Sequence, residues 1–464
     1  MNRKTPHRET RLKLSVAIRK IVTLIPDPKN PRAHSDRQVR QIANSIESYG
    51  FNVPILIDPE GHVIAGHGRL LACISLGWSE VPTIMLEHLT PAQLRAFMIA
   101  DNRLTENSTW DNTLLAESLK VLSELDLDFE LDAVGFEMGE IDLRIDQLDA
   151  PSESEEIGEL PARDAAPVSA LGDLWILGEH RLLCGNALVS GNYEVLLDGS
   201  NANVVFTDPP YNVPIDGHVA GLGHVKHREF QMAAGEMSVE EFTTFLKTVF
   251  AELVRVSSDG SIHFICMDWR HVLEILTAGK AVYTELKNIC VWAKDNAGMG
   301  SLYRSQHEFV FVFKNGTAPH VNNVQLGQFG RYRSNVWSYP GANSFGRSTE
   351  EGNLLELHPT VKPVTMIVDA FFDCSQRGDT VLDPFLGSGS TLIAAERAGR
   401  RCCGMELDPL YVDTAIRRWQ KHTGLAALLS RTRETFDVRT PTALNSEASD
   451  RVADRAAEVD HAAP

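Results

Sequence analysis

An apolar run that ends in a carboxylate, two prolines and an aromatic residue is the most distinctive chemical feature of the sequence. It begins at Asn203 and ends in Asp208, Pro209, Pro210 and Tyr211. The prolines fix the backbone and remove two N–H donors, so nearby carbonyls and the Asp208 carboxylate form a rigid set of acceptors. Such acceptors suit an exocyclic amine, whose lone pair they would direct toward an electrophile, while Tyr211 would stack on a base removed from its duplex. A plain strand and turn is the alternative.

A glycine turn followed by an acid at a fixed distance is the second motif. The sequence from Thr380 to Thr391 predicts a strand, a Gly-Ser-Gly turn and the start of a helix. Ligands bind at the carboxyl ends of strands in open α/β sheets, and glycine lets the backbone approach them. Glu406 ends the next apolar strand, 19 positions after Gly387, an offset suited to ribose hydroxyls. The pattern therefore predicts a nucleoside site, although the turn alone is equally typical of a plain tight turn. The sequence lacks GxGxxG, so NAD is less favoured.

The third motif is His358-Pro-Thr-Val-Lys362-Pro363, which precedes an apolar stretch from Val364 to Cys374. The spacing of the apolar residues predicts an amphipathic helix. This helix is expected to pack beside the glycine turn. Lys362 is interpreted either as a ligand contact or as a solvated turn residue.

Taken together, these motifs resemble those of the DNA amino-methyltransferases. Asp208–Tyr211 resembles motif IV, Asp383–Gly389 resembles motif I, and Glu406 is similar to the motif II acid. His358–Pro363 is similar to motif X. The chain order IV, X, I is the permuted arrangement of the β group in that family.

The resemblance extends over residues 172–425. Trp292–Lys294 and Arg304–Glu308 are similar to motif VIII, and the segment that begins at Gly172 is similar to the start of the catalytic domain. One departure is Asn186, where the family usually has Asp. A charged contact at that position is therefore not carried over.

The resemblance implies an α/β domain with a Rossmann-like sheet that uses S-adenosyl-L-methionine. It implies site-specific methyl transfer to N6 of adenine, or to N4 of cytosine, in a flipped-out base of double-stranded DNA. The Asp form of motif IV is commoner among adenine enzymes, so adenine is favoured. The implied catalytic residues are Asp208, Pro209, Pro210 and Tyr211. The implied cofactor-binding residues are Asp383, Phe385, Gly387, Gly389, Glu406 and Lys362.

Target recognition is expected between motifs VIII and X, in residues 314–357. Basic, amide and aromatic side chains there can read base edges, stack or wedge between bases. From 285 to 348 there are 7 Lys or Arg against 3 Asp or Glu, a local excess that favours phosphate contact. A polar loop with a few packed aromatics is the alternative. The candidate DNA-binding residues are Arg304, Arg331, Arg333, Trp337 and Asn343.

Residues 18–104 are expected to form a separate, small α+β domain. Gln38–Tyr49 has apolar residues at helical spacing, and two short apolar runs flank the Pro59–Gly61 turn. These patterns predict a helix and a β-hairpin. Asn30–Arg32, Ser45–Phe51 and Gly66–Ala72 resemble the ParB N-terminal domain.

A phosphate site is predicted at Gly66, His67, Gly68 and Arg69, because they lie between a predicted strand and a predicted helix. Backbone N–H groups at such a turn bind anions. Partition proteins commonly have Gly-Glu-Arg-Arg here, so nucleotide hydrolysis is not carried over. A turn that packs an adaptor domain is the alternative.

Charged residues are unevenly distributed along the chain. The formal net charge is −18, and residues 105–165 hold 18 Asp or Glu against 3 Lys or Arg. Residues 105–167 are therefore expected to be an acidic helical segment and linker, and residues 442–464 a disordered tail. Scattered cysteines, no apolar run of membrane length and no signal peptide indicate a cytoplasmic protein without a membrane partner. No metal site is expected.

Several alternatives stay open from the sequence. The chain could be a ParB-like DNA-binding module with an inactive methyltransferase half, although intact motifs argue against this. RNA or small-molecule methylation is less favoured, because the basic, aromatic region suits a polynucleotide. A homodimer, a nucleotide at the ParB-like domain and a partner restriction enzyme are also left open.

Overall fold

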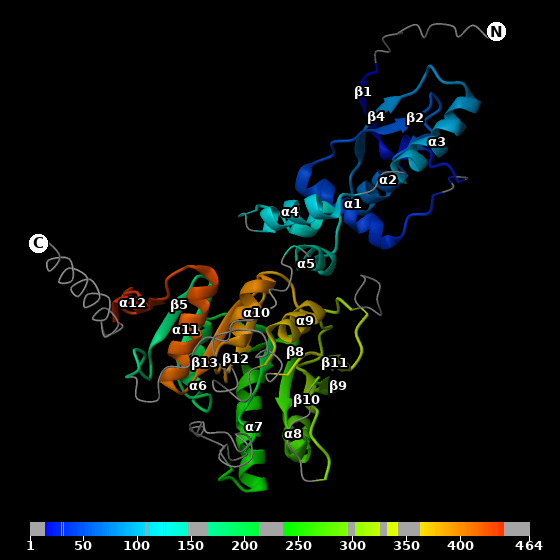
Figure 1. Cartoon of the computed structure of the whole chain (residues 1–464). Coiled ribbons are helices and arrows are strands. Elements are labelled where there is room, and N and C mark those ends of the chain that lie inside the picture. The colour runs from blue at the N-terminus through cyan, green and yellow to red at the C-terminus, as the bar shows by residue number, and fades with distance from the viewer. Residues whose placement is uncertain are drawn as a thin grey trace, which may run out of the picture. The chain divides into compact units, whose positions relative to one another are not determined.

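The computed structural model describes residues 14–106, 110–146, 148, 166–212, 235–295, 302–324, 332–341 and 362–439, except single positions 29, 31, 124 and 126. The chain divides into two compact units, residues 1–150 and 151–464 (Figure 1). No helix in the described part is both long and apolar enough to cross a membrane. All seven cysteines are buried free thiols.

The N-terminal unit contains a four-stranded sheet with helices on both faces. Its strand order is β1 (Val16–Lys20), β4 (Glu80–Met85), β2 (Ile55–Ile57), β3 (Val63–Ala65). The predicted hairpin is present, because β2 and β3 pair antiparallel. Helices α1 (Asp36–Tyr49) and α2 (His67–Ser75) share a core with one face, and α3 (Pro91–Glu106) covers the other.

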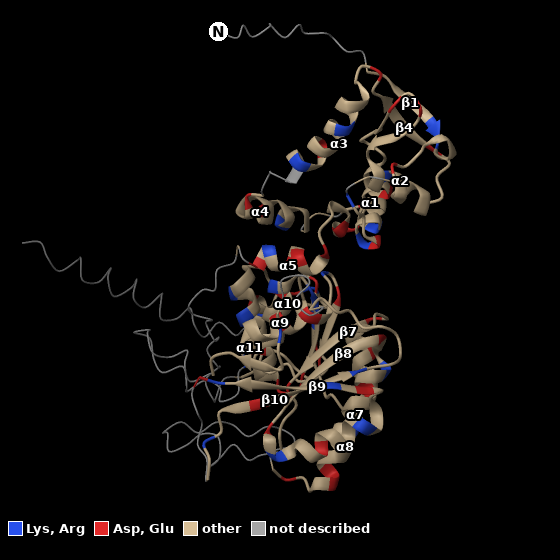
Figure 2. Ribbon diagram, turned by 90° about the vertical axis from the view of Figure 1, so that its right-hand side faces the viewer, with Lys and Arg blue, Asp and Glu red and all other residues tan. Residues whose placement is uncertain are grey.

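The acidic segment folds as part of this unit. Its helices α4 (Asn112–Ser123) and α5 (Met138–Asp146) enclose a small apolar cluster of their own. Arg37 on α1 is 2.8 Å from the Glu137 carboxylate. Figure 2 shows acidic and basic positions side by side along α5. The unit therefore extends past residue 104, where the ParB-like pattern ends.

The C-terminal unit contains a ten-stranded mixed sheet. Helices α6 (Ser190–Leu197), α7 (Val239–Arg255) and α8 (Val272–Val282) pack on one face. Helices α9 (Val364–Cys374), α10 (Ser390–Ala398) and α11 (Pro409–Thr423) pack on the other (Figure 1). The strand order is β11 (Val336–Ser338), β9 (Glu285–Ala293), β10 (His307–Lys314), β8 (Ser257–Met267), β7 (Ala202–Thr207), β12 (Thr380–Asp383), β13 (Arg401–Glu406), β6 (His180–Cys184), β5 (Leu174–Leu177), β14 (Leu428–Leu429).

This architecture confirms the predicted α/β class with a doubly covered, Rossmann-like sheet. Strand β7 leads through α7 to β8 on one side, whereas the neighbouring strand β12 leads through α10 to β13 on the other. The direction of winding therefore reverses between β7 and β12, and ligands bind in open α/β sheets at such a switch point. Strand β14 and helix α12 (Phe436–Arg439) continue the domain beyond residue 425. The predicted disordered tail lies outside the described residues.

Candidate active site

The two neighbouring strands at the switch point end in carboxylates. Strands β7 and β12 run parallel, with Val205 opposite Leu382, so Asp208 and Asp383 lie at the same edge of the sheet. The Thr207 hydroxyl donates a hydrogen bond of 2.8 Å to Asp383, and the Phe385 N–H donates one of 3.0 Å. Burial raises the pKa of Asp383 to about 6. These bonds tie the glycine turn to the end of β7.

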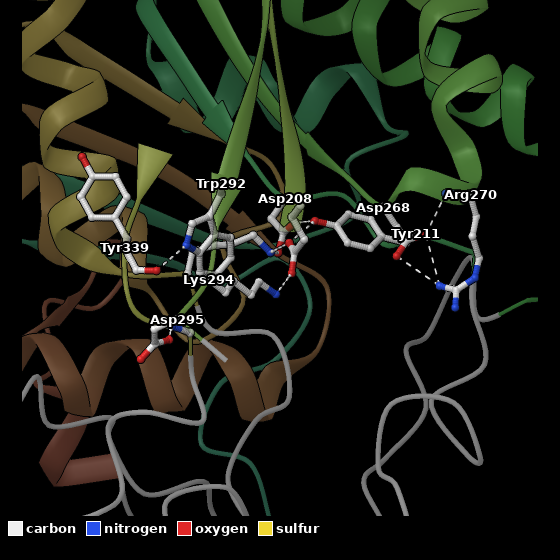
Figure 3. A network of polar contacts seen from close by, with 11 residues as sticks. Asp208, Tyr211, Asp268, Arg270, Trp292, Lys294, Asp295 and Tyr339 are labelled. Carbon is white, nitrogen blue, oxygen red and sulfur yellow. Dashed lines mark hydrogen bonds and ion pairs between the residues drawn. The ribbon is translucent and has the colours of Figure 1, made fainter. Parts of the chain in front are cut away.

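The Asp208–Tyr211 segment forms a rigid corner after β7. Pro209 is buried, and the Tyr211 side chain packs against the cores on both faces of the sheet. The Tyr211 hydroxyl donates to Asp208 Oδ1 at 2.5 Å and lies 3.2 Å from Glu308 Oε2 (Figure 3). The structure thus brings all four predicted catalytic residues to one strand end.

Lys362 lies immediately before α9 and points into this corner. Only 4% of its side chain is exposed, and its Nζ is 2.6 Å from Asp208 Oδ2. The same atom is 3.1 Å from Glu308 Oε2. The predicted cofactor contact of Lys362 stays a prediction, whereas its observed partners are the two carboxylates.

Glu308 was part of motif VIII in the sequence, but its place in the site was missed. It lies on β10, opposite Trp292 on β9, and accepts a hydrogen bond from Lys294, whose ammonium is 4.4 Å from the Trp292 ring centroid. Burial would raise the pKa of Glu308, but Lys362 and Lys294 outweigh it and lower the pKa to about 2. An acid within the apolar run of β10 was the signal that could have revealed it.

The glycine turn after β12 is held by Glu406, which ends β13. The Glu406 carboxylate accepts hydrogen bonds from the Gly387 N–H at 2.9 Å and the Asp408 N–H at 2.8 Å. Burial raises the pKa of Glu406 to about 7. Gly387 has a positive φ of 54°, and a Cβ built there meets no atom within 4 Å. The turn therefore has an open side next to a partly buried acid.

Gly389 serves a different purpose. Its φ is 89°, and a Cβ there would lie 2.9 Å from the Ala415 Cβ on α11. Glycine at this position thus allows α10 to begin close to α11. The expectation of a close ligand approach at Gly389 stays a prediction.

The candidate DNA-binding residues fall into three groups. Arg304 is exposed, and Arg331 and Asn343 lie outside the described residues. Arg333 and Trp337 are packed instead: Trp337 is 4% exposed, and the Arg333 guanidinium lies 3.1 Å from Asp373 and 5.2 Å from the Trp337 ring centroid. In this conformation Arg333 holds the β11 region to α9.

An exposed aromatic that the sequence analysis missed lies at the end of β8. Trp269 is 51% exposed, and the Arg270 guanidinium is 5.1 Å from its ring centroid. Arg270 is also 3.1 Å from Asp268 (Figure 3). Trp269 lies alone between the end of a strand and a helix, so it was part of no periodic pattern in the sequence.

The predicted phosphate site in the N-terminal unit lies at the start of α2. Gly66 caps this helix with a φ of 102°, and Arg69 folds back so that a Gly66 Cβ would lie 2.9 Å from its Nη2. Burial lowers the pKa of Arg69, and its Nε has no hydrogen-bond partner among the described residues. His67 accepts a bond of 3.3 Å from the Asp27 N–H, and Gly68 packs against Ile42 on α1. The phosphate assignment stays a prediction.

Comparison with known proteins identifies both units. Residues 202–417 match a family model described as DNA methylase, of the N6/N4 type, and residues 7–102 match the ParB N-terminal domain. The ParB-like nuclease domain-containing protein YnaK of Escherichia coli K12 is 43% identical over 81 residues, covering 18% of this chain and 93% of YnaK. Type II methyltransferase M2.MboI of Moraxella bovis is 23% identical over 234 residues, covering 48% of this chain and 82% of M2.MboI.

A solved structure is also similar to the C-terminal unit. The putative DNA modification methylase TTHA0409 of Thermus thermophilus, crystallised with S-adenosyl-L-methionine, is 23% identical, with 53% of this chain and 96% of that chain covered and a TM-score of 0.37.

The C-terminal unit is an α/β domain in which the candidate site residues gather at the switch point between β7 and β12. The chain contains an N6/N4 DNA methylase domain, with a ParB N-terminal domain in front of it. This confirms the resemblance inferred from the sequence. The family methylates exocyclic amines of DNA bases and uses S-adenosyl-L-methionine as the methyl donor.

Proposed function

We propose that the chain is a site-specific N6-adenine methyltransferase acting on double-stranded DNA, with Asp208–Tyr211 as its catalytic corner. The observation that supports this is the position of Asp208 beside the Asp383–Gly389 turn, across neighbouring strands β7 and β12. One strand end offers acceptors for an amine and the next offers an open turn for a nucleoside. The Asp form of the motif, commoner among adenine enzymes of the resembling family, supports adenine over cytosine.

In this proposal Asp208 and a carbonyl of the proline corner accept the two N–H bonds of the target amine. These hydrogen bonds localise the amine lone pair on nitrogen, which then forms the new N–CH3 bond. Formation of the N–CH3 bond would break the S–CH3 bond of the donor, with its electron pair left on sulfur, and the methylated nitrogen would lose its proton to solvent water. Tyr211 packs against the flipped base, which must leave the duplex to reach such a corner. Placement of reacting atoms in this way accounts for much of an enzyme's rate advantage.

The residues at the turn fit the methyl donor. Its ribose hydroxyls are donors and its sulfonium is cationic, and both suit the acidic edge formed by Asp383 and Glu406. Glu406 would hold the ribose and the open side of Gly387 would admit it. S-adenosyl-L-methionine, when bound, supplies an electrophilic methyl group.

Analysis of the product tests the assignment. The purified full chain is incubated with S-adenosyl-L-methionine and duplex DNA that lacks methylated bases, and the digested nucleosides are quantified by mass spectrometry. N6-methyladenine is expected. N4-methylcytosine would overturn the choice of base but not the reaction class. Cofactor binding without either product, on DNA containing all short sequences, would contradict the proposal.

Asp208→Asn tests the catalytic corner directly. The change keeps the size of the side chain but replaces one acceptor oxygen with a donor, so single-turnover transfer should fall at least about 10²–10³-fold. Cofactor affinity should stay within about twofold. Asp198→Asn is the matched control, since Asp198 is 74% exposed at the end of α6 and its φ of 53° suits asparagine. Parental activity in Asp208→Asn would show that the assignment is wrong.

A further inference from the structure

Four charged side chains of alternating sign form a ladder behind the catalytic corner. Its order is Lys294, Glu308, Lys362, Asp208, with an ion pair at each step. Figure 3 labels its two ends, Lys294 and Asp208. The side chains come from the end of β9, from β10, from the second residue before α9 and from the end of β7. Their exposed fractions are 24%, 12%, 4% and 24% respectively.

Stability alone does not explain such a ladder. Taking charges out of water costs several kcal/mol per ion, and replacing a buried ion pair with apolar residues is often neutral or stabilising. Two carboxylates and two ammonium groups give the ladder no net charge, which lowers the free-energy cost of burying it. The arrangement is better explained by what it does to Asp208.

The two oxygens of Asp208 have different neighbours. Oδ2 is 2.6 Å from the Lys362 ammonium, and Oδ1 faces the Tyr211 hydroxyl. Lys362 therefore fixes the plane of the carboxylate through one oxygen and leaves the other directed toward the corner. Charge-assisted hydrogen bonds of this length are stronger than neutral ones.

The Tyr211 hydroxyl has two acceptors within reach. It donates to Asp208 Oδ1, and Glu308 Oε2 is 3.2 Å away. An amine that arrives at Oδ1 would compete with Tyr211 for this oxygen. Because Glu308 lies beside Tyr211, the displaced hydroxyl can keep a hydrogen bond.

We propose that Lys362 and Glu308 are positioning residues for methyl transfer, with Lys362 anchoring Asp208 through Oδ2 and Glu308 receiving the Tyr211 hydroxyl when the amine binds. Glu308 in turn holds Lys362, and Lys294 holds Glu308. This role is distinct from the cofactor contact predicted for Lys362. It rests on the proposed function, because it concerns how Asp208 presents its acceptor.

The electrostatics are consistent with this arrangement. Burial raises the pKa of Asp208, and Lys362 opposes that rise. The titratable groups that face Asp208 or its partners are Lys362, Glu308, Lys294, Tyr211, Cys266 and Asp383. Without Lys362, Asp208 would lose the cation beside it while Glu308 stayed close, so the pKa of Asp208 would rise further.

The first test is the pH profile of Lys362→Met, a change that removes the charge and keeps much of the volume. Single-turnover transfer at pH 7 should fall about 100-fold, as expected for a misplaced reacting group, and should recover in part as the pH is raised and Asp208 ionises. Cofactor affinity should change less than twofold. Lys287→Met, on the same sheet but paired only with Glu285 at the surface, is the control. A Lys362→Met variant that loses cofactor affinity while keeping its rate at saturation would overturn the proposal.

Glu308→Gln tests the role of Glu308 separately from that of Lys362. It keeps an acceptor for Tyr211 but removes the charge that anchors Lys362, so a smaller loss of about tenfold in rate is expected at unchanged cofactor affinity. A parental rate would overturn the role of Glu308.

A stability measurement needs no methyl transfer at all. Lys362→Met should lower the folding equilibrium constant about 100-fold, because it leaves the largely buried Asp208 carboxylate without its ion-pair partner, whereas Glu308 keeps Lys294. Adding Asp208→Asn should restore at least about tenfold, since the two positions interact. Strictly additive effects would overturn the pairing. If the parental protein methylates no DNA, the proposed function fails while this cycle still reports on the ladder.

Discussion

Both units contain a strand, a glycine turn and a helix, but the side chain that faces each turn carries the opposite charge. At the start of α2, the Arg69 guanidinium folds over Gly66. At the start of α10, the Glu406 carboxylate holds the Gly387 N–H. A helix N-terminus favours anions, so Arg69 reinforces this preference whereas Glu406 reverses it. The same local geometry is therefore suited to a phosphate in one unit and to a ligand rich in hydrogen-bond donors in the other.

Removing the Glu406 charge should have the largest effect on the difference in ligand preference between the two turns. Glu406→Gln should weaken S-adenosyl-L-methionine binding about 100-fold, or about 2.7 kcal/mol, because an acceptor for ribose hydroxyls becomes partly a donor. Isothermal titration calorimetry gives the affinity. Unchanged binding would show that the turn does not use its acid.

The pH dependence of binding follows from the same residue. The pKa of Glu406 is about 7, and ribose hydroxyls bind the ionised form. Affinity for the parental protein should therefore fall about tenfold from pH 8 to pH 6, and Glu406→Gln should flatten this dependence. In the unliganded protein the raised pKa has the opposite consequence for stability. The contribution of Glu406 is present below its unfolded pKa and is lost as the pH rises through 7.

The two glycines of the second turn should respond differently to alanine. Gly389→Ala should lower the free energy of unfolding by about 2 kcal/mol, because positive φ strains alanine and its Cβ would lie 2.9 Å from the Ala415 Cβ. Gly387→Ala should cost about 1 kcal/mol, from its φ of 54° alone. Denaturant unfolding measures both. Equal losses would contradict the distinction between a packing glycine and an open one.

In the N-terminal unit, the expected effect is on nucleotide binding and is smaller than that of Glu406→Gln on the methyl donor. Arg69→Ala should weaken binding of a fluorescent nucleoside triphosphate to the full chain about tenfold, since one charged donor is lost. Arg95→Ala is the control, because Arg95 is exposed on α3. If the parental protein binds no nucleotide, the turn packs the domain and the phosphate prediction is wrong.

Local patterns predicted the elements and their chemistry well, because each depends on neighbouring residues. Three elements lie where the sequence pattern predicted them: the hairpin around Pro59–Gly61, the strand before Asp208 and the helix after Lys362. What the sequence did not reveal was pairing across the sheet. The partners Lys362 and Asp208 are 154 positions apart, and only the strand order brings them together.

The contacts in the structure also changed the interpretation of some residues that the sequence had suggested for binding. Arginine and tryptophan in the 314–357 region suggested base recognition, yet Arg333 and Trp337 pack against each other and against α9. A basic aromatic composition predicts both uses equally, so burial was needed to separate them. The acidic segment was expected to be helical and to lead into a linker; its composition did not show that the apolar residues of α4 and α5 form a cluster of their own.

The bond between Thr207 and Asp383 spans 176 positions of the chain. At about 5–20 residues per second of synthesis, roughly 9 to 35 seconds separate the emergence of its two ends from a ribosome. Throughout that interval the nascent polypeptide holds the acceptor corner without the strand that carries the glycine turn. The two halves of the proposed site therefore come together only after β12 and β13 have been synthesised.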